Sequence, residues 1–84
     1  MDVHFLIAER RRVADELRLA RTCLAILRAQ LTGSLTFEVR RHLVVVIGET
    51  SAQSRRLGAR LLEVDAAILE MHACEIGQAS RRVA

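Results

Sequence analysis

The fold is decided by residues 3–31, VHFLIAERRRVADELRLARTCLAILRAQL, in which apolar residues recur at alternating gaps of three and four. Only Arg10 interrupts the series with a polar side chain. A helix with this spacing presents one apolar seam to a neighbouring helix, as in a coiled coil. We therefore expect a first helix over about residues 2–32. The members of the series are Val3, Leu6, Val13, Leu17, Ala20, Leu24, Leu27 and Leu31.

A short turn, Thr32-Gly33-Ser34, follows this helix. Gly33 is expected to end the helix in a left-handed conformation, and Ser34 or Thr36 to cap the next one. So short a connection joins antiparallel neighbours. The sequence therefore predicts an all-α protein built on an antiparallel helical hairpin or a three-helix unit.

The segment after the turn has two interpretations. The run Leu43–Ile47 is rich in β-branched residues, which is typical of a buried strand. A single strand would need a second chain to satisfy its backbone hydrogen bonds. Glu38 has helical spacing to both Arg41 and His42. Helix over about residues 36–47 is the working prediction, with an intermolecular strand as the alternative.

Residues 48–54 are mostly polar, and they allow either a break between two helices or one continuous helix. Gly48 is suited to ending a short second helix, and Thr50 with Gln53 has the spacing of a capping box for a third helix over about residues 50–77. Alternatively, the second and third helices are continuous. An apolar face resumes at Leu57, and residues 77–84 are expected to be a frayed tail. That face comprises Leu57, Leu61, Val64, Ile68 and Met71, with Leu62, Leu69 and Ile76 beside it.

Composition points to association with other helices. The 84 residues suffice for a single domain spanning residues 1–84, yet 51% of them are hydrophobic and only 2% are aromatic. Since so small a chain shelters few side chains, we expect a homo-oligomer, preferably a dimer forming a four-helix bundle, or another helical protein as partner. The predicted interface comprises Leu6, Val13, Leu17, Leu24, Leu27, Leu31, Leu57, Leu61, Val64 and Ile68.

All 13 basic residues are arginines, which is typical of a GC-rich bacterial genome. A simple hairpin would bring six of them together, with few acidic residues nearby. We expect a second chain to supply the missing acids, because residues 63–75 contain four acidic residues and no arginine. The alternatives are a bend of the chain near residues 48–51 and contact with an anion or with the phosphates of a nucleic acid. The six are Arg10, Arg11, Arg12, Arg55, Arg56 and Arg60.

No catalytic, cofactor or metal site is predicted. His72 and Glu75 share one helix face, but no other carboxylate-rich segment completes a ligand set. The chain also lacks a membrane span, a signal sequence and a disulfide framework, so Cys23 and Cys74 are expected as thiols in the cytoplasm. The expected function is a non-enzymatic protein–protein interaction module: a small regulator, adaptor, chaperone-like factor or structural subunit. The alternative is a basic helical protein that binds nucleic acid.

Overall fold

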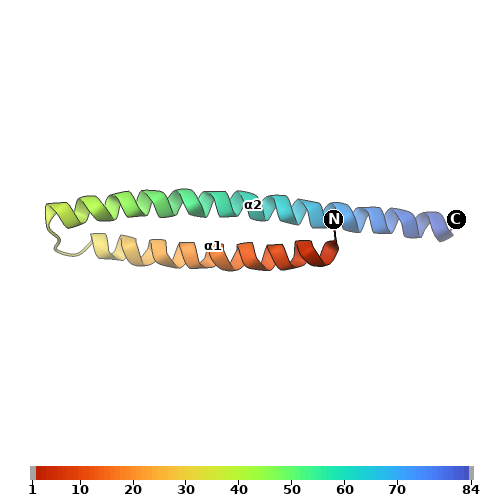
Figure 1. Cartoon of the computed structure of the whole chain (residues 1–84), viewed down its shortest axis with the longest axis horizontal. Helices are drawn as coiled ribbons and strands as arrows, with labels where there is room; N and C mark the ends of the chain where they lie inside the picture. Colours follow the sequence, from red (N-terminus) through yellow and green to blue (C-terminus); the bar gives the residue numbers. More distant parts are fainter. Residues whose placement is uncertain (1, 84) are drawn as a thin grey trace.

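Two antiparallel α-helices make up the hairpin (Figure 1). The computed structural model describes the backbone of residues 2–83 and the side chains of residues 2–78. Helix α1 spans Val3–Leu31, and helix α2 spans Phe37–Val83. The two pack against each other, and the backbone described contains no strand. The prediction of an all-α helical hairpin is therefore confirmed.

Polar side chains mark both ends of α1. The Asp2 carboxylate accepts a hydrogen bond from the His4 amide at 3.1 Å, as an N-cap does. At the other end, the Thr32 hydroxyl and amide both donate to the Ala29 carbonyl, at 2.7 and 3.2 Å. Thr32 thus closes the helix in a right-handed conformation. The prediction of a left-handed Gly33 is wrong, because none of the described residues has a positive φ.

Helix α2 continues through the polar segment 48–54. Thr36 caps its first turn, since its hydroxyl accepts from the Val39 amide at 3.3 Å. The Thr50 hydroxyl donates to the Val46 carbonyl at 2.8 Å, a bond within the helix instead of the predicted capping box. The chain therefore adopts the continuous alternative, neither breaking into a third helix nor forming a strand.

The far end of α2 corrects a prediction. The helix extends to Val83, whereas a frayed tail was expected from Gly77 onward. A helical glycine costs only about 1 kcal/mol relative to alanine, so one residue does not stop a long helix. No proline follows to break it.

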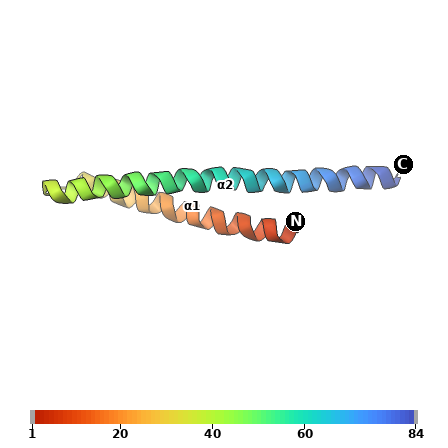
Figure 2. The same ribbon diagram turned by 45° about the horizontal axis from the view of Figure 1, so that its top comes forward.

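The molecule is a rod of 71 × 18 × 14 Å with a radius of gyration of 19.9 Å. A compact chain of this length has a radius of gyration of about 12 Å. The two helices have 29 and 47 residues, so α2 is about 27 Å longer and projects beyond the start of α1 (Figure 1). The helices cross at a shallow angle, so in the view of Figure 2 they overlap near the turn and lie apart at the N-terminus.

The core is a single row of aliphatic side chains between the helices. In the described part of the chain the buried apolar residues are Leu6, Val13, Leu17, Ala20, Leu24 and Val64. The solvent-accessible surface is 6588 Å², roughly 1,600 Å² more than a compact monomer of 9.4 kDa exposes. Two helices therefore leave much of this aliphatic chain uncovered.

Candidate interaction surface

The hairpin itself uses the predicted interface residues. Five of the ten are buried between α1 and α2, namely Leu6, Val13, Leu17, Leu24 and Val64. The other five are half-buried beside them: Leu27, Leu31, Leu57, Leu61 and Ile68. The seam that was expected to face a second chain is thus largely occupied within one chain.

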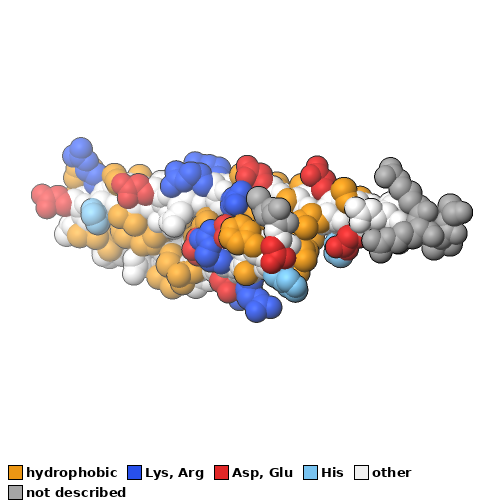
Figure 3. Space-filling model, turned by 45° about the vertical axis from the view of Figure 1, so that its right-hand side comes forward, with side chains coloured by type: hydrophobic (Ala, Val, Ile, Leu, Met, Phe, Trp, Pro, Cys, Tyr) orange, Lys and Arg blue, Asp and Glu red, His pale blue; other side chains and the backbone are white. Residues whose placement is uncertain are grey.

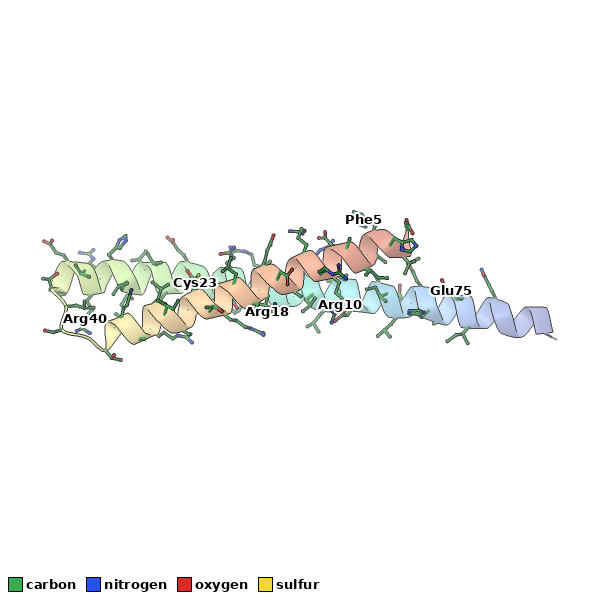
Figure 4. The ribbon with its side chains drawn as sticks, turned by 90° about the horizontal axis from the view of Figure 1, so that it is seen from below. Phe5, Arg10, Arg18, Cys23, Arg40 and Glu75 are labelled. Atoms are coloured by element: carbon green, nitrogen blue, oxygen red, sulfur yellow. The ribbon has the colours of Figure 1, made fainter. Side chains whose placement is uncertain are left out.

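Arg10 lies at a seam position but does not enter the core. Its side chain is half-exposed, and its Nε donates to Asp65 Oδ1 of α2 at 2.6 Å. Figure 4 labels Arg10 where α1 passes α2. Arg10 therefore joins the two helices through a carboxylate of the same chain, whereas an acid from a second chain was expected.

Two more of the six arginines, Arg12 and Arg60, lie beside the carboxylate of Glu9. The Arg12 guanidinium donates hydrogen bonds to the carboxylates of Glu9 and Glu16. The distance from Arg12 Nη1 to Glu16 Oε1 is 2.8 Å. Arg60 of α2 lies 3.7 Å from Glu9 and 3.3 Å from Glu63. The hydrogen bond from Arg12 lowers the pKa of Glu9 below its ordinary value of 4.5, and the charge of Arg60 acts in the same direction.

The six arginines therefore do not form one cationic patch. Arg10, Arg12 and Arg60 have carboxylate partners within the chain. Among the side chains that the structure describes, Arg11, Arg55 and Arg56 have no carboxylate within 4.0 Å. Consecutive helical residues point in different directions, which separates Arg11 from its two neighbours on α1. Carboxylates of the same chain thus lie beside three of the six arginines, where few acidic residues were expected. Contact of the six with an anion or a nucleic acid stays a prediction.

A second apolar series runs along α2 on the side away from α1. Its members recur at gaps of three and four from Val45 to Ile76, and only Arg55 is charged. We call this series the outer stripe. It comprises Val45, Gly48, Ala52, Arg55, Ala59, Leu62, Ala66, Leu69, Ala73 and Ile76.

The outer stripe is open to solvent. The exposed fractions are 73% for Leu62, 69% for Leu69 and 67% for Ile76. These residues were expected beside the apolar face of α2, but their exposure shows that they point away from α1. Alanines stand between them at helical spacing, so large and small side chains form two parallel rows.

Helix α1 offers a weaker counterpart to this stripe. Phe5, Leu19 and Ile26 are exposed by 55, 66 and 55% and share a flank at multiples of seven residues. Arg12, which is bound to Glu9 and Glu16, occupies the same flank between them. Figure 3 shows apolar side chains reaching the surface among charged ones. The longest apolar series left exposed is nevertheless on α2.

A groove lies where α1 begins and α2 continues. It is open and has a volume of about 480 Å³. Leu6 of α1 lines it together with residues of α2 that include Glu70, Met71, Cys74 and Glu75. Figure 4 labels Glu75 on the projecting part of α2. Met71 is half-buried there, so the groove exposes the end of the hairpin core.

The remaining polar residues form no reactive constellation. His72 Nδ1 lies 3.7 Å from Glu75 Oε2 on one face of α2. In the described residues, no three histidine, cysteine or acidic side chains gather in a way that would hold a metal ion. Cys23 and Cys74 are exposed thiols. Neither described helix has an apolar stretch long enough to cross a membrane.

The outer stripe was missed because alanine and glycine give a weak hydrophobic signal. The sequence prediction placed three of its members beside the apolar face that starts at Leu57, namely Leu62, Leu69 and Ile76. Without the small residues between them, they do not stand out as a separate series. Testing α2 for a second series at gaps of three and four would have found it. Comparison with protein families, curated proteins and solved structures finds no match for this chain.

Proposed function

We propose that this protein is a non-enzymatic helical interaction module that binds helical protein segments through the outer stripe of α2. The observation that carries the proposal is that Leu62, Leu69 and Ile76 are each about two-thirds exposed on one face. The hairpin seam is occupied within the chain, so among the described residues the outer stripe is the longest apolar series left exposed for a partner.

Energetics support this assignment. Burying one large aliphatic side chain contributes about 1.5–3 kcal/mol, and the outer stripe holds four that are more than half exposed, counting Val45. Monomeric proteins rarely keep extended apolar patches without a binding role. A two-helix hairpin with one row of buried residues is also marginally stable alone, so a partner would stabilise the fold that binds it.

The proposed setting is the cytoplasm of a bacterium, where the protein would act as a small regulator, adaptor, chaperone-like factor or structural subunit. Two exposed thiols suit a reducing compartment. Contact with nucleic acid has less support, because Arg10, Arg12 and Arg60 are already bound to carboxylates. Their charges would have to leave those partners to bind phosphates.

Site-specific photo-crosslinking in cells tests the proposal without knowledge of the partner. A photoreactive amino acid replaces Leu69 in the outer stripe and, as a matched control, the exposed Ala29 of α1. We expect covalent adducts with protein from position 69 and few from position 29. Equal yields at both positions, or adducts with nucleic acid alone, would contradict the proposal.

A further inference from the structure

We propose that the outer stripe binds a second copy of this chain, with the two α2 helices packed side by side and antiparallel. This inference rests on the proposed function, since it names the partner of the same surface. Three properties of the outer stripe support it: the order of large and small residues, the order of charges, and the uncovered area.

The two rows of the outer stripe complement each other only when the helices run in opposite directions. One row holds Ala59, Ala66 and Ala73, and the other holds Leu62, Leu69 and Ile76. In an antiparallel pair each row faces the opposite row of the partner, so Leu62 and Leu69 each meet a small side chain. A parallel pair would set alanine on alanine and Arg55 on Arg55.

The register with the longest overlap centres the contact between residues 60 and 61, the midpoint of the outer stripe. Leu62 then faces Ala59 of the second copy, and Leu69 faces its Ala52. Gly48 faces Ala73, where both residues are small and the backbones approach closely. At the ends of the outer stripe Ile76 faces Val45, which is the one pair of two large apolar side chains. A Cβ at Gly48 would meet nothing within the hairpin, so this space is open to a partner.

The charges along α2 reverse sign at the same midpoint. Arg55, Arg56 and Arg60 precede it, whereas Glu63, Asp65, Glu70 and Glu75 follow it. Antiparallel pairing about this point places the basic half of one helix beside the acidic half of the other. Arg56, which has no carboxylate partner in the described hairpin, then lies opposite Glu63 of the second copy. Glu49 opposite Glu70 is the like-charged exception.

The uncovered surface is large enough for such a dimer. The rod exposes roughly 1,600 Å² more than a compact monomer, while a standard interface covers about 800 Å² on each partner. Because the outer stripe lies on the side of α2 away from α1, the four helices would lie in a row, with the two α2 helices in the middle. That arrangement is an open row, whereas a four-helix bundle was expected from the sequence.

Sedimentation equilibrium of the purified full chain tests self-association. We expect a dimer, and we expect Leu62→Ser with Leu69→Ser to weaken it by about a hundredfold or more while circular dichroism shows an intact helix content. Leu19→Ser with Ile26→Ser removes similarly exposed side chains from α1 and should leave the dimer unchanged. A monomer throughout, or equal effects of the two pairs, would overturn the inference.

Charge reversal tests the pairing of Arg56 with Glu63. Arg56→Glu and Glu63→Arg each place two like-charged pairs in a homodimer, and each should weaken association by about tenfold. A mixture of the two variants forms heterodimers in which both pairs are attractive, so mixing should restore association. If mixing fails to restore it, the proposed register is wrong.

Cross-linking tests the orientation in a background with Cys23→Ser and Cys74→Ser, both of which replace exposed thiols. By the helical rise, the two copies of residue 59 would lie about 5 Å apart along the axis and the two copies of residue 73 about 37 Å apart. A short bifunctional reagent should therefore join Ala59→Cys to itself but not Ala73→Cys. Joining of both variants would indicate a parallel pair and overturn the inference.

These results separate the two proposals. A monomeric protein whose position 69 cross-links in cells to a different protein would overturn self-pairing and leave the interaction module standing. A monomer without adducts at position 69 would overturn both.

Discussion

Arg10 and Asp65 join the two helices of this hairpin across 55 positions of sequence, with 2.6 Å between Nε and Oδ1. Both side chains remain substantially exposed, at 50 and 39%. An exposed ion pair contributes little free energy of unfolding. This pair can form at only one position of α2 along α1, so it favours that alignment of the two helices. Sliding α2 along α1 would separate these groups.

We therefore predict a small effect on stability from Arg10→Gln or Asp65→Asn. Each should lower the free energy of unfolding by about 0.5 kcal/mol, which corresponds to roughly 2–4 °C in the midpoint of thermal unfolding. Circular dichroism measures it. The double reversal Arg10→Asp with Asp65→Arg should recover much of the loss. The matched control is Arg18→Gln, because among the described side chains Arg18 pairs only with Asp15 within α1, at 3.6 Å.

Replacing Leu24 by glutamate should unfold the hairpin. Leu24 is 7% exposed in a core of one side-chain row, so the change buries a charge without a partner. The same substitution at Leu62, which is 73% exposed, should retain the helical circular dichroism spectrum. A Leu24→Glu protein that kept its helix content would show that position 24 lies outside the core.

The pH dependence of stability should include a contribution from Glu9. Its pKa is lowered in the folded state, chiefly by the hydrogen bond from Arg12, relative to the ordinary value of 4.5. This contribution is therefore present above about pH 4.5 and is lost as the pH falls through the lowered folded value. Thermal unfolding of Glu9→Gln should show a smaller decrease between pH 7 and pH 3 than the parent chain shows.

Arg12→Gln provides the check on cause. It removes the same hydrogen bond, so it should reduce the acid sensitivity to a similar degree. The variant with both substitutions should add little to either one alone. Additive effects would mean that another carboxylate carries the pH dependence.

Gly58→Ala should stabilise the protein. Gly58 lies inside α2, and a Cβ placed there meets no atom within 4 Å. Alanine in a helix interior is favoured over glycine by about 0.5–1 kcal/mol, which should raise the unfolding midpoint by roughly 2–8 °C. Gly33→Ala, in the loop, gains no helix propensity and should change the midpoint little. A decrease at position 58 would reveal a close contact there, such as one with a partner.

Spacing alone was enough to predict the hairpin from sequence, because only Arg10 interrupts the seam of α1 and the turn after it is short. It could not show that α2 is unbroken. Thr50 and Gln53 have the spacing of a capping box, so the polar segment resembles the start of a new helix. In the structure the Thr50 hydroxyl bonds within the helix and leaves the backbone ladder intact.

The surface was harder to predict than the fold. Helix α2 carries two apolar series, and the sequence does not say which one faces α1. The pairing of Arg10 with Asp65 could not be used to predict how α2 aligns along α1. The sequence offers several oppositely charged residues as possible partners for each of them. For the same reason, the acids near the arginines were assigned to a second chain when α2 itself supplies two of them, Asp65 and Glu63.

Salt dependence should separate an apolar interface from binding to nucleic acid. Between 50 and 200 mM salt, a protein that neutralises six to ten phosphates loses about 10³–10⁵ in affinity. Contact through Leu62, Leu69 and Ile76 carries no such term, and the flanking charges add only a modest one. We therefore expect association through the outer stripe to change by no more than a few-fold over that range.

Measuring self-association of the purified chain and its affinity for a DNA duplex in the same buffers provides the comparison. Tight DNA binding that weakens steeply with salt and falls in Arg11→Gln with Arg55→Gln would favour the nucleic-acid alternative, because these two arginines have no carboxylate partner in the described chain.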